Sequence, residues 1–160
     1  MKFFLDIDGV MVHANPQKSV ELEEDGFYKF NSIAVEVLNS IILKTKDELI
    51  LSTSHRFRFN LIQWKEIFKS RGICTEKISI LNLPLQHNNS RKTEIIYWIT
   101  EHNFSTDDIV IIDDDKSLND LPAYLKQRLV LTNPYLGLNT SSDLSKILNR
   151  KPKKYIAKAS

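Results

Sequence analysis

The chain has 160 residues and a formal net charge of +2, from 22 basic and 20 acidic side chains. This length fits one domain with a core of its own. Cys74 is the sole cysteine, which excludes an internal disulfide framework and any cysteine-based zinc or iron–sulfur site. The sequence has no apolar run of about 20 residues that could span a membrane, and it reaches Asp6 too early for a signal peptide. We therefore expect a cytoplasmic protein without a membrane partner.

Short apolar runs alternate with helical patterns along the chain. Buried strands are predicted at residues 2–7, 48–51, 78–81, 109–112 and 129–131. Helical patterns begin after Asn31 or Ser32, at Phe57, after Ser90 and near Leu144. Residues 10–30 contain turn residues and are predicted to form a loop or hairpin excursion. This alternation predicts an α/β fold, a single three-layer domain with a parallel sheet of about five strands.

The charges are distributed unevenly between the body of the chain and its C-terminus. Residues 150–160 carry five cations and no acid, which leaves a net charge of −3 on residues 1–149. We accordingly divide the chain into a domain at 1–149 and a basic C-terminal tail at 150–160. Two interpretations of the tail stay open, a solvated and disordered terminus or a segment that binds a polyanion.

The first predicted strand ends in two carboxylates, Asp6 and Asp8, followed by Gly9. Acids one residue apart on an extended strand project to the same side, close enough to share a cation. Glycine lets the chain turn sharply after them. A calcium-binding loop is excluded, because Val10 stands where that loop needs an oxygen ligand and Gln17 stands where it needs a glutamate. An aspartate pair that merely caps a turn is the alternative.

Hydroxyl and basic side chains follow at the next predicted element ends. Ser52 and Thr53 end the second strand, where hydroxyls and backbone N–H groups can hold a phosphate oxygen or cap a helix. Arg91 and Lys92 open a helix, although cations there oppose the helix dipole. Two such residues suggest an anionic partner, while solvated basic side chains are the alternative.

The fourth predicted strand ends in adjacent acids, Asp113, Asp114 and Asp115. Adjacent carboxylates repel one another unless a cation or a basic group compensates them. The carboxyl ends of parallel strands share one edge of a sheet, and ligands bind beyond that edge. The sequence therefore predicts a single site where the acids, hydroxyls and bases converge.

In this order the segments resemble the haloacid dehalogenase (HAD) superfamily, most of whose members are phosphatases and phosphotransferases. The four motifs match Asp6-Ile7-Asp8-Gly9-Val10, Ser52, Arg91 or Lys92, and Asp113-Asp114. A narrower resemblance, to the HAD domains of bacterial RNA-repair proteins, rests on the segments 50–56, 91–98 and 133–138. The chain departs from these patterns at Val10, where many members have threonine, and at His55, where the narrower group tends to have tryptophan. No glycine precedes the acids of the fourth motif.

The resemblance implies a Rossmann-like core without a large cap domain, and it assigns roles to the site residues. Asp6 would be the nucleophile that forms an aspartyl-phosphate, and Asp8 the general acid and base. Mg²⁺ would be held by Asp6, Asp8 through its backbone carbonyl, Asp113 and Asp114. Phosphate oxygens would be bound by Ser52 or Thr53 and by Arg91 or Lys92. Among the four histidines only His55 flanks a motif and is retained as a candidate site residue.

The substrate implied is a phosphomonoester. Residues 10–30 and 81–89 are the only segments that could partly cover the site, and an open site suits a bulky substrate such as a polynucleotide end. Nucleotides and small metabolites also reach open sites. A binding module that retains the fold without catalysis is the alternative from another class, and the complete acidic set argues against it.

Overall fold

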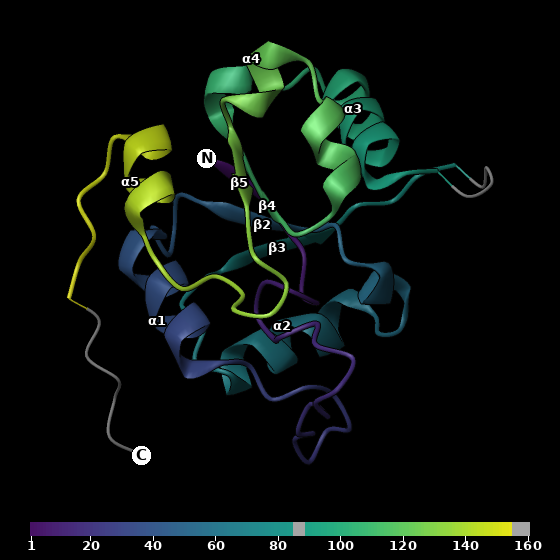
Figure 1. Cartoon of the computed structure of the whole chain (residues 1–160), viewed down its shortest axis with the longest axis vertical. Helices are drawn as coiled ribbons and strands as arrows, with labels where there is room; N and C mark the ends of the chain where they lie inside the picture. The colour runs from purple at the N-terminus through teal and green to yellow at the C-terminus, as the bar shows by residue number, and fades with distance from the viewer. Residues whose placement is uncertain (85–88, 155–160) are drawn as a thin grey trace.

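The structure is a computed structural model that describes residues 1–84 and 89–154 of the chain. Its centre is a five-stranded sheet whose strands all run parallel, in the order β3-β2-β1-β4-β5 (Figure 1). The strands span Lys2–Leu5 (β1), Glu48–Leu51 (β2), Lys77–Ile80 (β3), Ile109–Asp113 (β4) and Leu129–Leu131 (β5). The α/β class and the parallel sheet predicted from the sequence are confirmed.

Helices cover both faces of this sheet (Figure 1). They span Ser32–Ile41 (α1), Leu61–Ser70 (α2), Arg91–Glu101 (α3), Ala123–Lys126 (α4) and Ser142–Leu148 (α5). Alternate residues of β1 serve the two faces: Phe3 and Leu5 pack with the cluster that includes α1, α2 and α5, and Phe4 packs with the cluster that includes α3 and α4. Within the described ranges, no helix is long and apolar enough to cross a membrane.

The helix predicted to begin at Phe57 begins four residues later. Residues Ser54–Phe57 form a 3₁₀ helix (η1), and the Phe57 side chain is exposed. Asn60 caps α2 by accepting a hydrogen bond from the backbone N–H of Gln63, whose side chain accepts one from the Asn60 N–H in return. This capping box sets the helix start, so the apolar spacing that included Phe57 was misleading.

The excursion at residues 10–30 packs against the body of the domain. Leu22 and Tyr28 form an isolated antiparallel bridge, as in a short hairpin. Phe27 and Phe30 are buried in the core on the α1 and α2 side of the sheet. The second segment expected to cover the site, 81–89, is described only in part, because residues 85–88 lie outside the described ranges.

The start of the basic tail is held by the folded domain. The guanidinium of Arg150 donates to both carboxylate oxygens of the buried Asp47, and the N-terminal amino group of Met1 lies 3.4 Å from the same carboxylate. The backbone N–H of Lys153 donates to the Ser40 carbonyl. Arg150, the first residue of the predicted tail, therefore contacts the folded domain. Asp47 immediately precedes β2, so these contacts lie at the amino edge of the sheet.

Candidate active site

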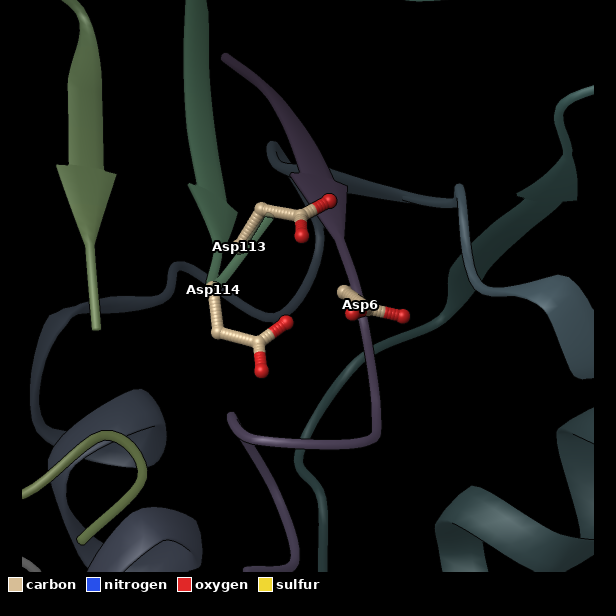
Figure 2. Close-up of side chains that lie close together, drawn as sticks. All are labelled: Asp6, Asp113 and Asp114. Atoms are coloured by element: carbon tan, nitrogen blue, oxygen red, sulfur yellow. The ribbon is translucent and has the colours of Figure 1, made fainter. Parts of the chain in front are cut away.

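Two central strands bring their terminal acids side by side at the carboxyl edge of the sheet. Leu5 of β1 is paired with Ile112 of β4, so the chain continues into Asp6 on one strand and Asp113 on the other. The backbone N–H of Asp6 extends the pairing by donating to the Ile112 carbonyl at 3.1 Å. Figure 2 shows the Asp113 and Asp114 side chains extending from the end of β4 toward the chain that carries Asp6.

The carboxylates of Asp6, Asp113 and Asp114 each place an oxygen within 4.8 Å of the others. Asp6 is 5% exposed and Asp113 is fully buried. Burial and the charge of Asp6 raise the pKa of Asp113 to about 8 and that of Asp114 to about 6. Burial likewise raises the pKa of Asp6, against the opposing effect of Arg91. This concentration of acid is electrostatically unfavourable without a cation.

Gly9 makes the close approach of Asp114 possible. Its φ of +76° lies in the left-handed region. A Cβ atom at this position would lie 2.0 Å from Asp114 Oδ2. The turn after β1 therefore needs glycine both for its left-handed backbone conformation and for space. Because Gly9 has no side chain, there is room for Asp114, the third acid of the cluster.

Arg91 is the base that reaches the acids. Its guanidinium lies 3.2 Å from Asp113 Oδ2 and 3.6 Å from Asp6 Oδ1. Lys92 instead donates its backbone N–H to Ser117 Oγ, and its side chain forms no ion pair with any acid in the described ranges. The structure thus brings Arg91 into the cluster and leaves the Lys92 ammonium out of it.

Arg91 is itself held by Glu94, which the sequence analysis missed. Glu94 Oε2 lies 3.7 Å from Arg91 Nε, and Glu94 Oε1 accepts a hydrogen bond at 2.8 Å from the buried Arg56. Both pairs are shielded from water, where ion pairs are screened less than on the surface. A signal was available, because Arg91 and Glu94 are three residues apart on one predicted helix and face the same side.

Ser52 and Thr53, the two hydroxyl candidates, differ in what they contact. Thr53 Oγ1 accepts a hydrogen bond from the His55 N–H at 3.2 Å, which caps η1. Ser52 is fully buried, and its Oγ has no hydrogen-bond partner within the described part of the chain. A buried hydroxyl without a partner costs roughly 1–3 kcal/mol. Because the Ser52 carbonyl accepts from the Arg91 guanidinium, Ser52 lies beside the cluster.

The carboxylate of Asp8 has a partner outside the cluster. Its Oδ2 lies 2.7 Å from Nε2 of His55, the histidine that the sequence analysis had retained because it flanks the second motif. The Asp6 carboxylate therefore lies with those of Asp113 and Asp114, which are more than a hundred residues away in the sequence. The nearby Asp8 carboxylate is not part of this cluster. Whether Asp6 and Asp8 share a cation stays a prediction.

The chemistry of the cluster fits a hard divalent cation. Carboxylate oxygens are the ligands that Mg²⁺ prefers, and it commonly uses one or two of them together with phosphate oxygens. A cation at this position would offset the repulsion that raises the pKa of Asp113 and Asp114. Asp6, Asp113 and Asp114 are the residues that could hold it.

The comparisons with known proteins add one finding to this geometry. A family model described as the HAD domain in Swiss Army Knife RNA repair proteins matches residues 3–142. The chain belongs to this family. The comparisons with curated proteins and with solved structures gave no match.

Membership of the HAD domain family indicates a hydrolase of the phosphatase type. The match includes every residue named at the carboxyl edge of the sheet and ends before Arg150. In this HAD domain, a basic side chain and a buried hydroxyl accompany the acids of β1 and β4. Three acids, a basic side chain and a buried hydroxyl are thus available in one place.

Proposed function

We propose that the protein is a Mg²⁺-dependent phosphomonoester hydrolase that works through an aspartyl-phosphate on Asp6. The observation that carries this proposal is the buried Asp6 carboxylate, which lies beside two further acids and the guanidinium of Arg91. An anionic nucleophile and a phosphate dianion repel each other, so catalysis needs positive charge on both sides of the reacting centre. The site offers both a base, Arg91, and a cluster of acids suited to a cation.

Chemically, the reaction would proceed in two displacements at phosphorus. An Asp6 oxygen attacks the phosphorus, the bond to the leaving oxygen breaks, and Asp8 gives that oxygen a proton. Water then attacks the phosphorus of the acyl phosphate while Asp8 takes its proton, which releases phosphate and restores Asp6. When bound, Mg²⁺ would supply the positive charge that lets the phosphoryl group approach Asp6.

Two groups are suited to hold the phosphoryl oxygens. Arg91 can turn donors toward an oxyanion, and Ser52 has a buried hydroxyl whose unmet hydrogen bond a phosphate oxygen would satisfy. Thr53 and Lys92 are less suited, because the Thr53 hydroxyl caps η1 and the Lys92 ammonium pairs with none of the described acids. We therefore assign the phosphate contacts to Arg91 and Ser52.

For the substrate we propose the phosphorylated end of a polynucleotide. The description of the matching family names RNA repair, and this supports a nucleic-acid end over a free metabolite. A small metabolite and a non-catalytic binding role are the competing outcomes.

A phosphatase screen with purified protein tests the proposal. Oligonucleotides phosphorylated at the 3′ or the 5′ end, mononucleotides, sugar phosphates and phosphopeptides are compared with and without Mg²⁺, and Asp6→Asn is the control. We expect Mg²⁺-dependent phosphate release, fastest from one class of oligonucleotide end and lost in Asp6→Asn. Fastest release from a mononucleotide or sugar phosphate would reject the polynucleotide substrate. No release from any class would reject the phosphatase function.

A further inference from the structure

His55 and Asp8 form a pair that none of the proposed roles explains. The Nε2 atom of His55 lies 2.7 Å from Oδ2 of Asp8, although the residues are 47 positions apart. The Asp8 side chain is 41% exposed, so packing around it does not fix the orientation of its carboxylate. The His55 side chain is only 21% exposed and is the more strongly fixed partner. The contact therefore restrains Asp8 more than it restrains His55.

Three contacts fix the position of His55. Its ring meets the buried Phe27 edge-on at 5.6 Å between centroids and meets Tyr28 at 5.4 Å, both nearly perpendicular. Its backbone N–H donates to Thr53 Oγ1. Edge-to-face packing of this kind favours one ring orientation. The ring is thus held from the 10–30 excursion and from η1, with Nε2 directed toward Asp8.

We propose that His55 is a positioning residue that holds the carboxyl group of Asp8 toward the leaving oxygen of the substrate. This rests on the proposed function, in which Asp8 donates the proton that the leaving oxygen takes. A hydrogen bond from Nε2–H to Oδ2 leaves Oδ1 to carry that proton. It also keeps the carboxylate apart from the cluster of Asp6, Asp113 and Asp114. His55 itself exchanges no proton in this scheme.

The leaving group provides a readout that distinguishes positioning from general structural support. p-Nitrophenolate departs without protonation, whereas the alkoxide of β-glycerol phosphate needs a proton as its bond to phosphorus breaks. The ratio kcat/KM reports only the steps up to departure of the leaving group. Hydrolysis of the aspartyl-phosphate, which is common to both substrates, therefore does not enter the comparison.

The variants are His55→Leu, which removes the hydrogen bond, and His55→Gln, which keeps an N–H donor on a side chain of similar reach. His102→Leu is the matched control, because His102 contacts Trp98 and Phe104 near the end of α3. Asp8→Asn and the double variant with His55→Leu show whether the two residues act together. Thermal unfolding of each variant checks that the fold is retained.

For His55→Leu we expect kcat/KM to fall about 30-fold with β-glycerol phosphate and less than about threefold with p-nitrophenyl phosphate, since general acid catalysis is worth about 10²–10⁴-fold. His55→Gln should recover most of the loss. Adding His55→Leu to Asp8→Asn should cost nothing more. An equal fall with both substrates, or none, would overturn the role of His55 while leaving the phosphatase intact. A wild-type protein inactive on both substrates would instead reject the proposed function.

Discussion

Acidic side chains are buried at both edges of the sheet, but they are balanced by nearby cations at only one of them. At the amino edge, the single carboxylate of Asp47 contacts the Arg150 guanidinium and the amino group of Met1. At the carboxyl edge, the carboxylates of Asp6, Asp113 and Asp114 lie together, and Arg91 is the cation that reaches them within the described residues. One edge is compensated and the other carries an excess of acid.

The pKa values follow this difference. Burial raises the pKa of Asp47, but the hydrogen bonds from Arg150 and Leu43 outweigh it and hold the pKa below its ordinary value. At the other edge burial is reinforced by neighbouring carboxylates, and the pKa of Asp113 rises to about 8. A compensated carboxylate stabilises the fold, whereas an excess of buried acid reduces stability and is suited to a cation. Four predictions test this contrast.

Removing the proposed nucleophile, Asp6, should give the largest effect. In Asp6→Asn we expect turnover to fall by roughly 10³-fold or more, because the attacking carboxylate is lost. The same change removes one of the repelling charges, so the metal-free protein should gain about 1 kcal/mol of stability, or roughly 3 °C in Tm. Phosphate release and thermal unfolding measure the two. Turnover within about tenfold of wild type would show that Asp6 is not the nucleophile.

Breaking the compensated edge should reduce stability and spare catalysis. Arg150→Met leaves the buried Asp47 carboxylate with the amino group of Met1 as its remaining cation. We expect a loss of about 3 kcal/mol, or roughly 9 °C in Tm, with unchanged kcat per folded molecule. The matched control is Lys151→Met, at an exposed position. If both substitutions lower Tm equally, the contact of Arg150 with Asp47 does not stabilise the fold.

Mg²⁺ should stabilise the protein more at high pH than at low pH. The folded-state pKa is about 8 for Asp113 and about 6 for Asp114, above the ordinary carboxyl value. The stability contributed by their protonated forms is complete below about pH 4, and it is lost as the pH rises through these values. Cation binding needs the deprotonated forms, so the increase in Tm on adding Mg²⁺ should be larger near about pH 8.5 than near about pH 5.5.

The chelated protein serves as the control for this measurement. Chelation should abolish phosphate release but leave the helical circular dichroism unchanged, because the two apolar clusters that hold the sheet do not include the acids. An increase in Tm that is the same at both pH values would contradict the assignment of the cation to these carboxylates.

The smallest effect is expected from the basic tail. Lys151, Lys153 and Lys154 are exposed, and the Lys153 backbone is tied to Ser40 near the end of α1, at the edge opposite the acid cluster. Replacing the three lysines with serine should change the slope of log(kcat/KM) against log salt, for a short phosphorylated oligonucleotide, by less than about 0.7, the value of one phosphate contact. A change in this slope of about 2 would instead show that the tail binds phosphates of the substrate.

The sequence predicted the strands and the edge at which the site forms with few errors. The continuous apolar run of β4 and the acids that follow it are local features, and they survive folding because a buried strand needs that pattern. The cap at Ser90 was also readable, since a serine before a helix accepts a backbone N–H of the first turn. The predicted helix start at Phe57 was wrong, because periodicity alone does not show where a helix starts.

The site was predicted less completely, and the omissions have one cause. Arg91 and Lys92 have similar charge and adjacent positions, and successive residues on a helix point in different directions. Which of them faces Asp113 depends on how α3 is rotated against the sheet, and the tertiary structure selects Arg91. The choice between Ser52 and Thr53 also depends on the tertiary structure. The Thr53 hydroxyl caps η1, which leaves the Ser52 hydroxyl without a partner among the described residues.

The sequence by itself determined the parallel α/β order and which acids end the central strands, because both follow from local periodicity and residue type. The tertiary structure alone decided the pairs made across long separations, such as Asp8 with His55 and Asp47 with Arg150. Those pairs depend on which loops meet at each edge of the sheet, and local patterns carry no information about that meeting. Which acids lie together and which pair with other residues is therefore a property of the fold.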